Sequence, residues 1–455
     1  MANNKTNLCE GPLTKQVISF VIPILLLGFL QQLFNAADVV LAGHLSTSGS
    51  DAVAAVGVTN PLRSLLVSFF MGCSTGSAVT VSHAIGARNK KDIKDSVHTA
   101  MLLSVIIGGL LTVVGVASSG ALLKAMSTPE AILPQSKIYL QTHFMTMIPS
   151  MVYNFGAALL RANGDTQKPL YYYLVTAPVK LVLTVLFLLV FKLDLVGISL
   201  ATLVSQSLAA FLVVNSLVKS DRDIKLSLRD LRITKKPMVK ILKLGIPTGI
   251  QSSTYSLSSV VIQSSVNSLS HLTGFITGNA AAYSIENFAE IVTGAYLQVS
   301  MSFVGQNVGA RNYKRAKKAY MCAIALCTLT VVILSAIVIG FAKPLLSLYI
   351  KNSKEAIYWG TVRILFIFGP MIIQGFMDTT SGALRGLGVS ISNTVISLLG
   401  ICGFRIAWCM TVFQIPQYHT PQALFIAYPI SWVIISVLQL AVFVVVFNKQ
   451  KKNAN

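Results

Sequence analysis

The chain has 455 residues, of which 54% are hydrophobic and only 11% are charged. Soluble globular proteins carry about 25% charged residues, so this composition excludes an ordinary soluble enzyme, and its apolar character excludes a disordered chain. The formal net charge is +21, and the six cysteines lack CxxC spacing, which argues against a zinc site and a disulfide framework. The sequence therefore predicts an all-α polytopic membrane protein.

Apolar stretches long enough to cross a bilayer, about 20 residues each, recur along the whole chain. We predict twelve transmembrane helices from them. In chain order they cover residues 15–42, 52–82, 97–118, 133–160, 169–191, 195–218, 238–269, 278–306, 319–341, 356–384, 391–413 and 421–447. No segment between these stretches is long enough to form a soluble domain.

Lysine and arginine gather on one side of the predicted membrane. Of the 36 basic residues, 26 lie on the side that also holds both termini, and nine of these fall within residues 219–243. Positive residues mark the cytoplasmic side, so we expect a multi-pass protein of the cell membrane with both termini in the cytoplasm. The positive charge thus reflects topology and does not indicate nucleic acid as a partner. Membrane lipid is an expected partner, particularly for the basic linker.

The two halves of the chain repeat with an offset of about 224 residues, almost half its length. Gly86-Ala87-Arg88-Asn89 returns as Gly309-Ala310-Arg311-Asn312, and Pro23 returns as Pro247. The segment 158–164 returns less closely as 382–388. We predict two pseudo-symmetric six-helix lobes, 1–224 and 225–455, joined by a cytoplasmic linker at about 219–237 and related by an axis along the membrane normal. The glycine that begins each Gly-Ala-Arg-Asn turn is expected to end its helix in αL geometry.

Eight ionisable residues fall at membrane depth. They are Asp38, Glu286, Glu290, Asp378, Arg63, Lys180, Arg363 and Arg405. Each would cost about 2.5–3.5 kcal/mol if it were unpaired in the bilayer centre. Two interpretations follow: the charges form structural ion pairs, or they line an aqueous path for substrate and coupling ion. The many hydroxyl residues in the seventh stretch favour a helix that partly lines a water-filled cavity.

Four of these residues share one depth with Thr184 and Thr202, roughly 5–8 residues from the span ends opposite the termini, or about 8–12 Å. They are Asp38, Glu286, Arg363 and Arg405. We therefore predict one polar cluster in each lobe. The first cluster joins Asp38 to Lys180, with Thr184 and Thr202 beside them. The second cluster joins Glu286, Arg363 and Arg405, whereas Asp378 lies nearer the cytoplasmic end of its span.

Three strings resemble the multidrug and toxic compound extrusion (MATE) transporters. They are Asn35–Leu45 with Asp38 inside it, Val304–Asn312, and Leu384–Gly388. The resemblance implies export of organic compounds, often amphipathic cations, in exchange for H⁺ or Na⁺. It also implies that the family's acids of spans one, eight and ten fall on Asp38, Glu286 and Asp378, and that Thr202 matches a threonine of a cation site.

Two departures from the family pattern favour H⁺ over Na⁺. Lys180 and Thr184 stand where the family commonly has an asparagine and an aspartate, and Tyr255 stands where Na⁺-coupled members carry a glutamate. The expected cation-coupling or substrate-binding residues are Asp38, Lys180, Thr184, Thr202, Tyr255, Glu286, Glu290, Arg363, Asp378 and Arg405. No resident metal or cofactor is expected.

The preferred hypothesis is a monomeric secondary antiporter that exports small organic molecules. The alternative is a flippase or exporter of anionic or lipid-linked cargo, because bases in a cavity suit phosphate and carboxylate groups. An enzyme or a channel is not expected, since the sequence has no phosphate-binding glycine loop, HExxH motif, nucleophile elbow or filter-like motif.

Overall fold

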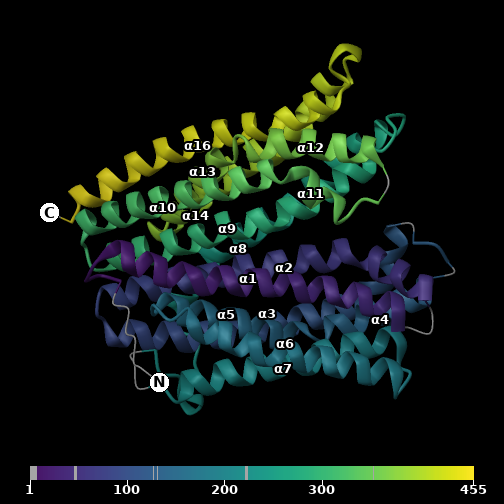
Figure 1. Ribbon diagram of the computed structural model, residues 1–455. Coiled ribbons are helices and arrows are strands. Elements are labelled where there is room, and N and C mark those ends of the chain that lie inside the picture. Colours follow the sequence, from purple (N-terminus) through teal and green to yellow (C-terminus); the bar gives the residue numbers. More distant parts are fainter. Residues whose placement is uncertain are drawn as a thin grey trace. The chain divides into compact units, whose positions relative to one another are not determined.

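The computed structural model describes residues 8–454 except 46–48, 127, 131, 221–223 and 352. Within its helices, the side chains of residues 35, 36, 38–40, 42–45, 49–58, 60, 61, 256 and 257 also lie outside the description. The described residues are mostly helical and contain no strand (Figure 1). The prediction of an all-α protein is therefore confirmed.

Helices cover all twelve of the predicted spans. They are α1 (Leu13–Leu45), α2 (Gly49–Gly86), α3 (Lys90–Ala125), α4 (Leu133–Phe144), α5 (Met147–Ala162), α6 (Gln167–Leu189), α7 (Asp194–Val218), α8 (Lys235–Ser268), α9 (Phe275–Gly309), α10 (Tyr313–Gly340), α12 (Lys354–Phe368), α13 (Met371–Gly386), α14 (Ser390–Ser397), α15 (Arg405–Met410) and α16 (Pro421–Lys452). The short helix α11 (Ala342–Ser347) follows α10, and a π-helix, η2 (Leu398–Phe404), joins α14 to α15. Single-turn 3₁₀ segments at Leu228–Asp230, Val412–Gln414 and Pro416–Tyr418 complete the described elements.

Two predicted spans are each broken into two helices. The fourth span breaks between α4 and α5, and the tenth span breaks between α12 and α13 with a bend of 47°. Phe144 and Phe368 end the first pieces, and Met147 and Met371 begin the second pieces. The two breaks are separated along the chain by the same offset as Pro23 and Pro247. The helix breaks thus fall at equivalent positions of the two halves, as the repeat in the sequence predicts.

Apolarity separates the helices into two groups. Among the described residues, eight helices are long and apolar enough to cross a membrane, or nine if the bent pair α12–α13 counts as one span. Helices α8 and α9 have 34 and 35 residues but are not in this group. Both helices are long enough to cross a membrane, so it is their polar residues that keep them out of this group.

The contacts between residues divide the chain into two compact units. The first, unit 1, contains residues 22–249, and the second, unit 2, contains Leu8–Val21 together with residues 250–455. Thus the first turns of α1 pack with unit 2, and the first half of α8 packs with unit 1. The divisions fall beside Pro23 and Pro247, which both lie inside their helices. The lobe boundary at 224/225 stays a prediction, because packing contacts and an internal repeat are different properties.

The two Gly-Ala-Arg-Asn turns end their helices as predicted, but the αL residue is different. Helix α2 ends at Gly86 and α9 ends at Gly309. The positive φ belongs to the arginines, +52° at Arg88 and +56° at Arg311, so the expectation of αL glycines is wrong. In each turn the asparagine that follows caps the next helix, since its side chain accepts a backbone N–H three residues on, which holds the arginine between two helix ends.

Within unit 1, α2 and the first half of α8 approach through glycine. A Cβ placed on Gly72 would overlap the backbone of Gly249, and one on Gly76 would overlap the carbonyl oxygen of Ile241. Gly245 likewise meets the backbone of Cys73. Small residues spaced four apart on both helices allow this close backbone contact.

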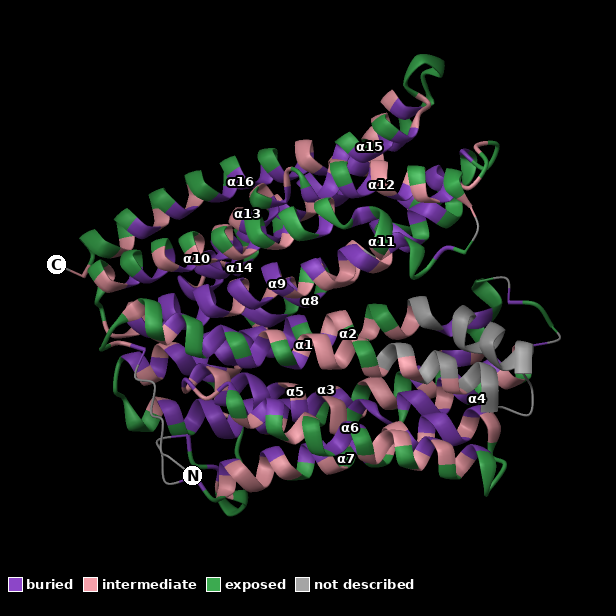
Figure 2. Cartoon of the chain, viewed as in Figure 1, coloured by how far each residue is buried: buried purple, intermediate pink, exposed green. Residues whose placement is uncertain are grey.

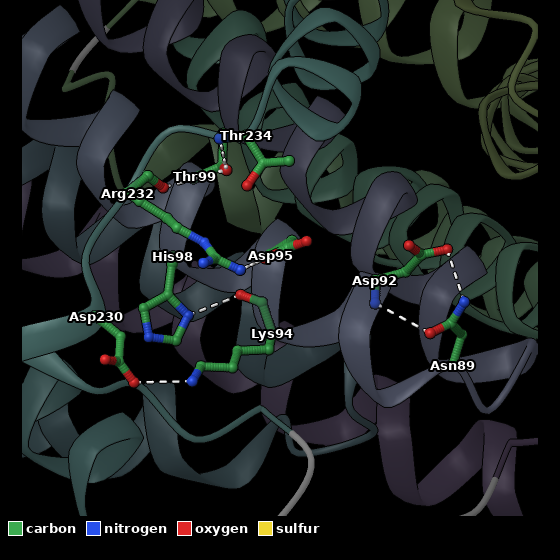
Figure 3. A network of polar contacts seen from close by, with 9 residues as sticks. All are labelled: Asn89, Asp92, Lys94, Asp95, His98, Thr99, Asp230, Arg232 and Thr234. Carbon is green, nitrogen blue, oxygen red and sulfur yellow. Dashed lines mark hydrogen bonds and ion pairs between the residues drawn. The ribbon is translucent and has the colours of Figure 1, made fainter.

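The basic linker is tied to the start of α3 in unit 1 (Figure 3). Arg232 bonds Asp95 at 2.7 Å, and Lys94 bonds Asp230 at 2.8 Å. The buried ring of His98 accepts the backbone N–H of Ser227 at 3.1 Å. Because the Lys94 ammonium donates a hydrogen bond to it and adds its charge, the pKa of the Asp230 carboxyl is lowered. Residues 227–234 of the linker are therefore held as a strap against the start of α3.

In unit 2, the segment Leu8–Gln16 is bonded to the start of α10 in a similar way. The guanidinium of Arg315, near the start of α10, donates to the carbonyl oxygens of Leu8 and Glu10 and to the side chain of Gln16. Asn307 also donates to the Leu8 carbonyl at 3.1 Å. This segment is held mainly through uncharged acceptors, whereas the linker in unit 1 is held through ion pairs.

Candidate functional site

A buried ion pair joins α9 to α12 in unit 2. Two nitrogens of Arg363 donate to one carboxylate oxygen of Glu286, at 2.6 and 3.2 Å. A third nitrogen donates to the side-chain oxygen of Asn279 at 2.7 Å. Arg363 is 2% exposed and Glu286 is 4% exposed. The predicted contact between Glu286 and Arg363 is therefore present, and it has the geometry of a structural pair sealed from solvent.

Three aromatic rings surround the same guanidinium. The Arg363 carbon Cζ lies 5.4 Å from the ring centres of Tyr283 and Phe425 and 5.6 Å from that of Tyr428. Each ring face carries partial negative charge and favours a cation within about 6 Å. Neither Asn279 nor these rings belonged to the predicted site, because a ring in an apolar span looks like ordinary core from sequence alone.

Arg405 lies near this pair but bonds differently. Its Nε donates to the hydroxyl of Ser431 at 2.9 Å, and its Cζ lies 4.2 Å from the ring centre of Tyr428. Among the described residues Arg405 forms no ion pair, so the predicted three-membered cluster is joined through the shared Tyr428 ring and not through Glu286. Arg405 directly follows the π-helix η2, and such segments often occur at functional sites.

One face of α9 is polar although it lies at membrane depth. Tyr283, Asn287, Glu290 and Gln298 recur at helical spacing, and the structure leaves them exposed or half-buried. Glu290 lies one turn after Glu286 and forms no ion pair with a described residue. Lipid cannot solvate such a face, so we expect it to meet water.

Helix α8 carries a second polar face in unit 2. Ser259, Gln263, Ser264 and Asn267 are exposed there, and Gln263 donates to Asn267 at 3.0 Å. The exposed face of α10 is the opposite in character, with Leu329, Ile333 and Ile337. Figure 2 shows exposed residues repeating along α10 and α16, as expected of helices with one side turned to lipid. The exposed faces of α8 and α9 are thus polar, whereas the exposed face of α10 in the same unit is apolar.

Tyr255 belongs to a further polar group inside unit 2. Its hydroxyl accepts a hydrogen bond from the side chain of Gln251 at 2.7 Å, and the oxygen of Gln251 accepts from Arg385 and Thr394 at 3.3 Å each. Gln251 is 2% exposed. Asp378 is half-buried on α13 and forms no ion pair with the part of the chain described.

In unit 1 the corresponding contact has no acid among its described members. Arg63 on α2 donates to the hydroxyl of Tyr139 on α4 at 2.8 Å, and its Cζ lies 5.5 Å from the same ring centre. The hydroxyl of Ser199, on α7, donates to the Tyr139 carbonyl at 3.4 Å. Sequence reasoning named Arg63 as a base at membrane depth but missed Tyr139.

The predicted cluster around Asp38 is only partly described. Asp38 lies on α1, and its side chain falls outside the described residues, so the pairing with Lys180 stays a prediction. Lys180 is half-buried on α6. Thr184, on the same helix, is fully buried and its hydroxyl has no hydrogen-bond partner among the described residues, while the hydroxyl of Thr202 bonds the Ile198 carbonyl of its own helix. Within the described part of the chain, no three His, Cys, Asp or Glu residues gather as a metal site.

Comparison with known proteins agrees with this architecture. The MatE family model matches the chain twice, at residues 23–186 and 247–411, so the two matches begin at the equivalent prolines Pro23 and Pro247. The chain is 28% identical over 449 residues to a probable multidrug resistance protein, YoeA of Bacillus subtilis, covering 95% of this chain and 94% of that protein. It is 25% identical to the FAD transporter of Shewanella oneidensis, over 87% of each chain.

A solved structure shows the same fold at low sequence identity. The outward-facing conformation of a multidrug resistance MATE family transporter superposes with a TM-score of 0.90, at 19% identity, over 99% of this chain and all of that chain. The double match of the family model covers well over half of the sequence, and its spacing repeats the offset found in the helix breaks. The chain belongs to the MatE family, the transporters of multidrug and toxic compound extrusion.

Proposed function

We propose that this chain is a secondary active antiporter that exports organic, amphipathic or cationic compounds in exchange for H⁺. The observation that carries the proposal is the polar face of α9 at membrane depth, with Glu290 exposed on it. A carrier needs such a face, because it must present the same groups to water and then to a closed interior. An acid that alternates between these surroundings changes its proton affinity, and each pKa unit of difference is worth about 1.4 kcal/mol of coupling.

Proton coupling is favoured over Na⁺ coupling by the groups present. A Na⁺ site requires several oxygen ligands, yet one of the two Glu286 carboxylate oxygens already accepts two hydrogen bonds from Arg363. Tyr255 offers a hydroxyl already bonded to Gln251. Of the acids at membrane depth, Glu290 and Asp378 form no ion pair with a described residue, and a single carboxylate is sufficient to carry a proton.

The accessible acids also favour a cationic substrate. A protonatable carboxylate in a polar face can bind an organic cation and a proton in alternation, so that binding of one displaces the other. Several relatives carry the description of multidrug resistance proteins, which agrees with amphipathic cargo. Glu290 is an exposed carboxylate on the polar face of α9, and we therefore assign the coupling role to it first.

A second candidate function is export of an anionic compound. Arg405 and Arg63 are held by a hydroxyl and an aromatic ring each, and no described acid forms an ion pair with either guanidinium. A phosphate or carboxylate can be recognised by such groups. The relative described as an FAD transporter supports this alternative, since FAD carries a pyrophosphate.

The placement in the cell follows from the same proposal. We infer a place in the cell membrane with both termini in the cytoplasm, because 26 of the 36 basic residues fall on the side of the termini. We also propose that the chain acts as a monomer. Labelling of a cysteine introduced in the tail after α16, in a variant whose six native cysteines are changed to serine, by a reagent that does not cross membranes, tests this orientation. Labelling of intact cells would contradict it.

Transport in proteoliposomes tests the function directly. The ΔpH and the Na⁺ gradient are varied independently, with ethidium as a cationic substrate and FAD as an anionic one. We expect ethidium uptake that follows ΔpH and ignores Na⁺, and a loss of the ΔpH dependence in Glu290→Gln. The matched control is Glu355→Gln, which changes an exposed carboxylate at the start of α12. Uptake driven only by Na⁺, or of FAD alone, would contradict the proposal.

A further inference from the structure

A groove opens on unit 2 between α11 and the first turns of α12. It encloses about 720 Å³ and is lined by Lys343, Pro344, Ser347, Lys354, Ile357, Tyr358 and Thr361. Its size lies within the range of about 300–1,000 Å³ that is usual for small-molecule sites. Figure 1 places α11 and α12 at the end of unit 2 opposite the C-terminus. The groove therefore lies at one end of the unit, and none of its described lining residues is an acid.

The surroundings of the groove are those of a surface in contact with lipid. Ile337 and Phe341, at the end of α10, are 52% and 60% exposed. On α12, Tyr358 and Leu365 are 58% and 49% exposed. These side chains are apolar or aromatic, in contrast to the polar face of α9, and aromatic residues are enriched where a protein meets the headgroup level of a bilayer.

The lining combines an apolar wall with two positive charges. Pro344, Ile357 and Tyr358 form the wall, and the hydroxyl of Thr361 is bonded to the carbonyl of Ile357, so it adds no free polar group. Lys343 and Lys354 lie at the ends of their spans, where headgroups are found, and neither forms an ion pair with a described residue. A phosphate between two ammonium groups with a hydrocarbon chain along the wall satisfies every part of this lining.

We propose that this groove, which we call the α11–α12 groove, binds one anionic phospholipid. Its phosphate lies between Lys343 and Lys354, and an acyl chain follows the apolar wall. The apolar wall assigns the phosphate to a lipid and not to a free inorganic ion, since a free ion would leave the wall without a partner. None of the lining residues belongs to the polar face of α9, so the site is distinct from the one proposed for transport.

The repeat shows that unit 1 carries a different residue at a position that lines the groove in unit 2. Helices α4 and α12 end at the equivalent residues Phe144 and Phe368, and by this alignment Thr361 corresponds to Lys137. The starts of α3 and α10, which follow the two Gly-Ala-Arg-Asn turns, align Lys343 with Gly120 in the same way. The Lys137 stem lies over Gly120, with Cε 3.5 Å from where a Cβ would be. A long side chain thus covers in unit 1 the surface that a threonine leaves open in unit 2.

Native mass spectrometry of the full chain tests the proposal. The purified protein is equilibrated in mixed micelles with equal amounts of phosphatidylglycerol and phosphatidylethanolamine, and retained lipid is counted. We expect one phosphatidylglycerol per chain that survives detergent washing. The double variant Lys343→Ala, Lys354→Ala should retain it roughly 10- to 30-fold less, given the usual attraction of lysine for anionic headgroups. The control Lys124→Ala, Lys351→Ala removes two exposed lysines outside the groove and should behave as the wild type.

A third variant separates the groove from general electrostatic attraction. Thr361→Lys introduces the residue of unit 1, so it fills the groove while it adds a positive charge. Loss of the retained phosphatidylglycerol in this variant is expected if the groove is the site. A gain would show that surface charge alone attracts the lipid and would overturn the proposal. Equal retention of the two lipids by the wild type, or equal loss in the lysine control, would overturn it as well.

Discussion

The α2–α4 contact of unit 1 and the α9–α12 contact of unit 2 occupy equivalent positions in the internal repeat. Helices α2 and α9 end at equivalent glycines of the repeated turn, and α4 and α12 end at equivalent phenylalanines. Counted back from these ends, Arg63 corresponds to Glu286, and Tyr139 corresponds to Arg363. Each pair joins its two helices, but the guanidinium comes from α2 in unit 1 and from α12 in unit 2.

The difference lies in what balances the charge. In unit 2 the guanidinium faces a buried carboxylate, so the pair is neutral and each member depends on the other. In unit 1 the described partner of Arg63 is a phenol, which satisfies one donor and offers a ring face but no negative charge. The repeat thus conserves the geometry of the contact, while the chemistry differs between its two copies. The contact in unit 2 should therefore lose more stability than the contact in unit 1 when one partner is removed.

The largest expected effect is the loss of the acid in unit 2. Glu286→Gln leaves Arg363 as an uncompensated buried charge, so the free energy of unfolding should fall by about 3–5 kcal/mol. Arg63→Met in unit 1 removes a charge together with its hydrogen bond and should cost less, about 1–3 kcal/mol. Steric-trap unfolding in micelles measures both, with Glu355→Gln as the control. An equal or smaller loss for Glu286→Gln would remove the distinction between the two contacts.

The pairing itself can be isolated by a double-mutant cycle. If Glu286 and Arg363 stabilise each other, the variant that carries both Glu286→Gln and Arg363→Gln should be more stable than the sum of the single losses predicts, by about 2 kcal/mol. The same unfolding measurement applies. Strictly additive losses would indicate that Asn279 and the aromatic rings hold the guanidinium without help from the carboxylate.

A smaller effect is expected for the phenol of unit 1. Tyr139→Phe keeps the ring beside Arg63 but removes the hydroxyl that accepts its hydrogen bond. A hydrogen bond to a charged group contributes about 1.5–3 kcal/mol, and we expect a loss at the lower end because the ring contact persists. Tyr358→Phe, on the exposed face of α12, is the matched control. No change in Tyr139→Phe would mean that the ring contact alone holds Arg63.

The smallest effect concerns the segments that strap each unit. The pKa of Asp230 is lowered in the folded protein, so its pairing with Lys94 stabilises the fold above the unfolded value of about 3.9 and is lost as the pH falls through the folded pKa. The stability difference between wild type and Asp230→Asn should therefore be present at pH 7 and vanish in acid. Arg315→Gln in unit 2 should show no such dependence, because its partners there are carbonyl and amide oxygens.

Urea-dependent protection of the linker from protease, measured at several pH values, checks this prediction. A difference between wild type and Asp230→Asn that grows as the pH falls would have the wrong sign. A difference that is unchanged between neutral pH and strong acid would show that the charge of Asp230 does not act on the strap.

Much of this architecture was predictable from local pattern. Apolar runs of bilayer length predicted the helices, and the returning Gly-Ala-Arg-Asn and proline positions predicted the repeat that the family model matches twice. Counting residues from the span ends placed Glu286 and Arg363 at one depth, and the structure pairs them. Depth can be read in this way because the rise of a helix is constant and the membrane sets its ends.

Azimuth around the helix axis could not be read in the same way. It decides that Arg405 meets Ser431 and Tyr428 instead of Glu286, and that Arg63 meets Tyr139. The glycine and arginine of each turn illustrate the same limit, since the neighbouring helix end places Arg88 and Arg311 in the αL region. Sequence alone thus determined the helices, their repeat and the depth of the charges, because these depend on chain-local hydrophobicity and a fixed rise. Only the tertiary structure decided the partners, because a partner depends on how two helices are rotated against each other.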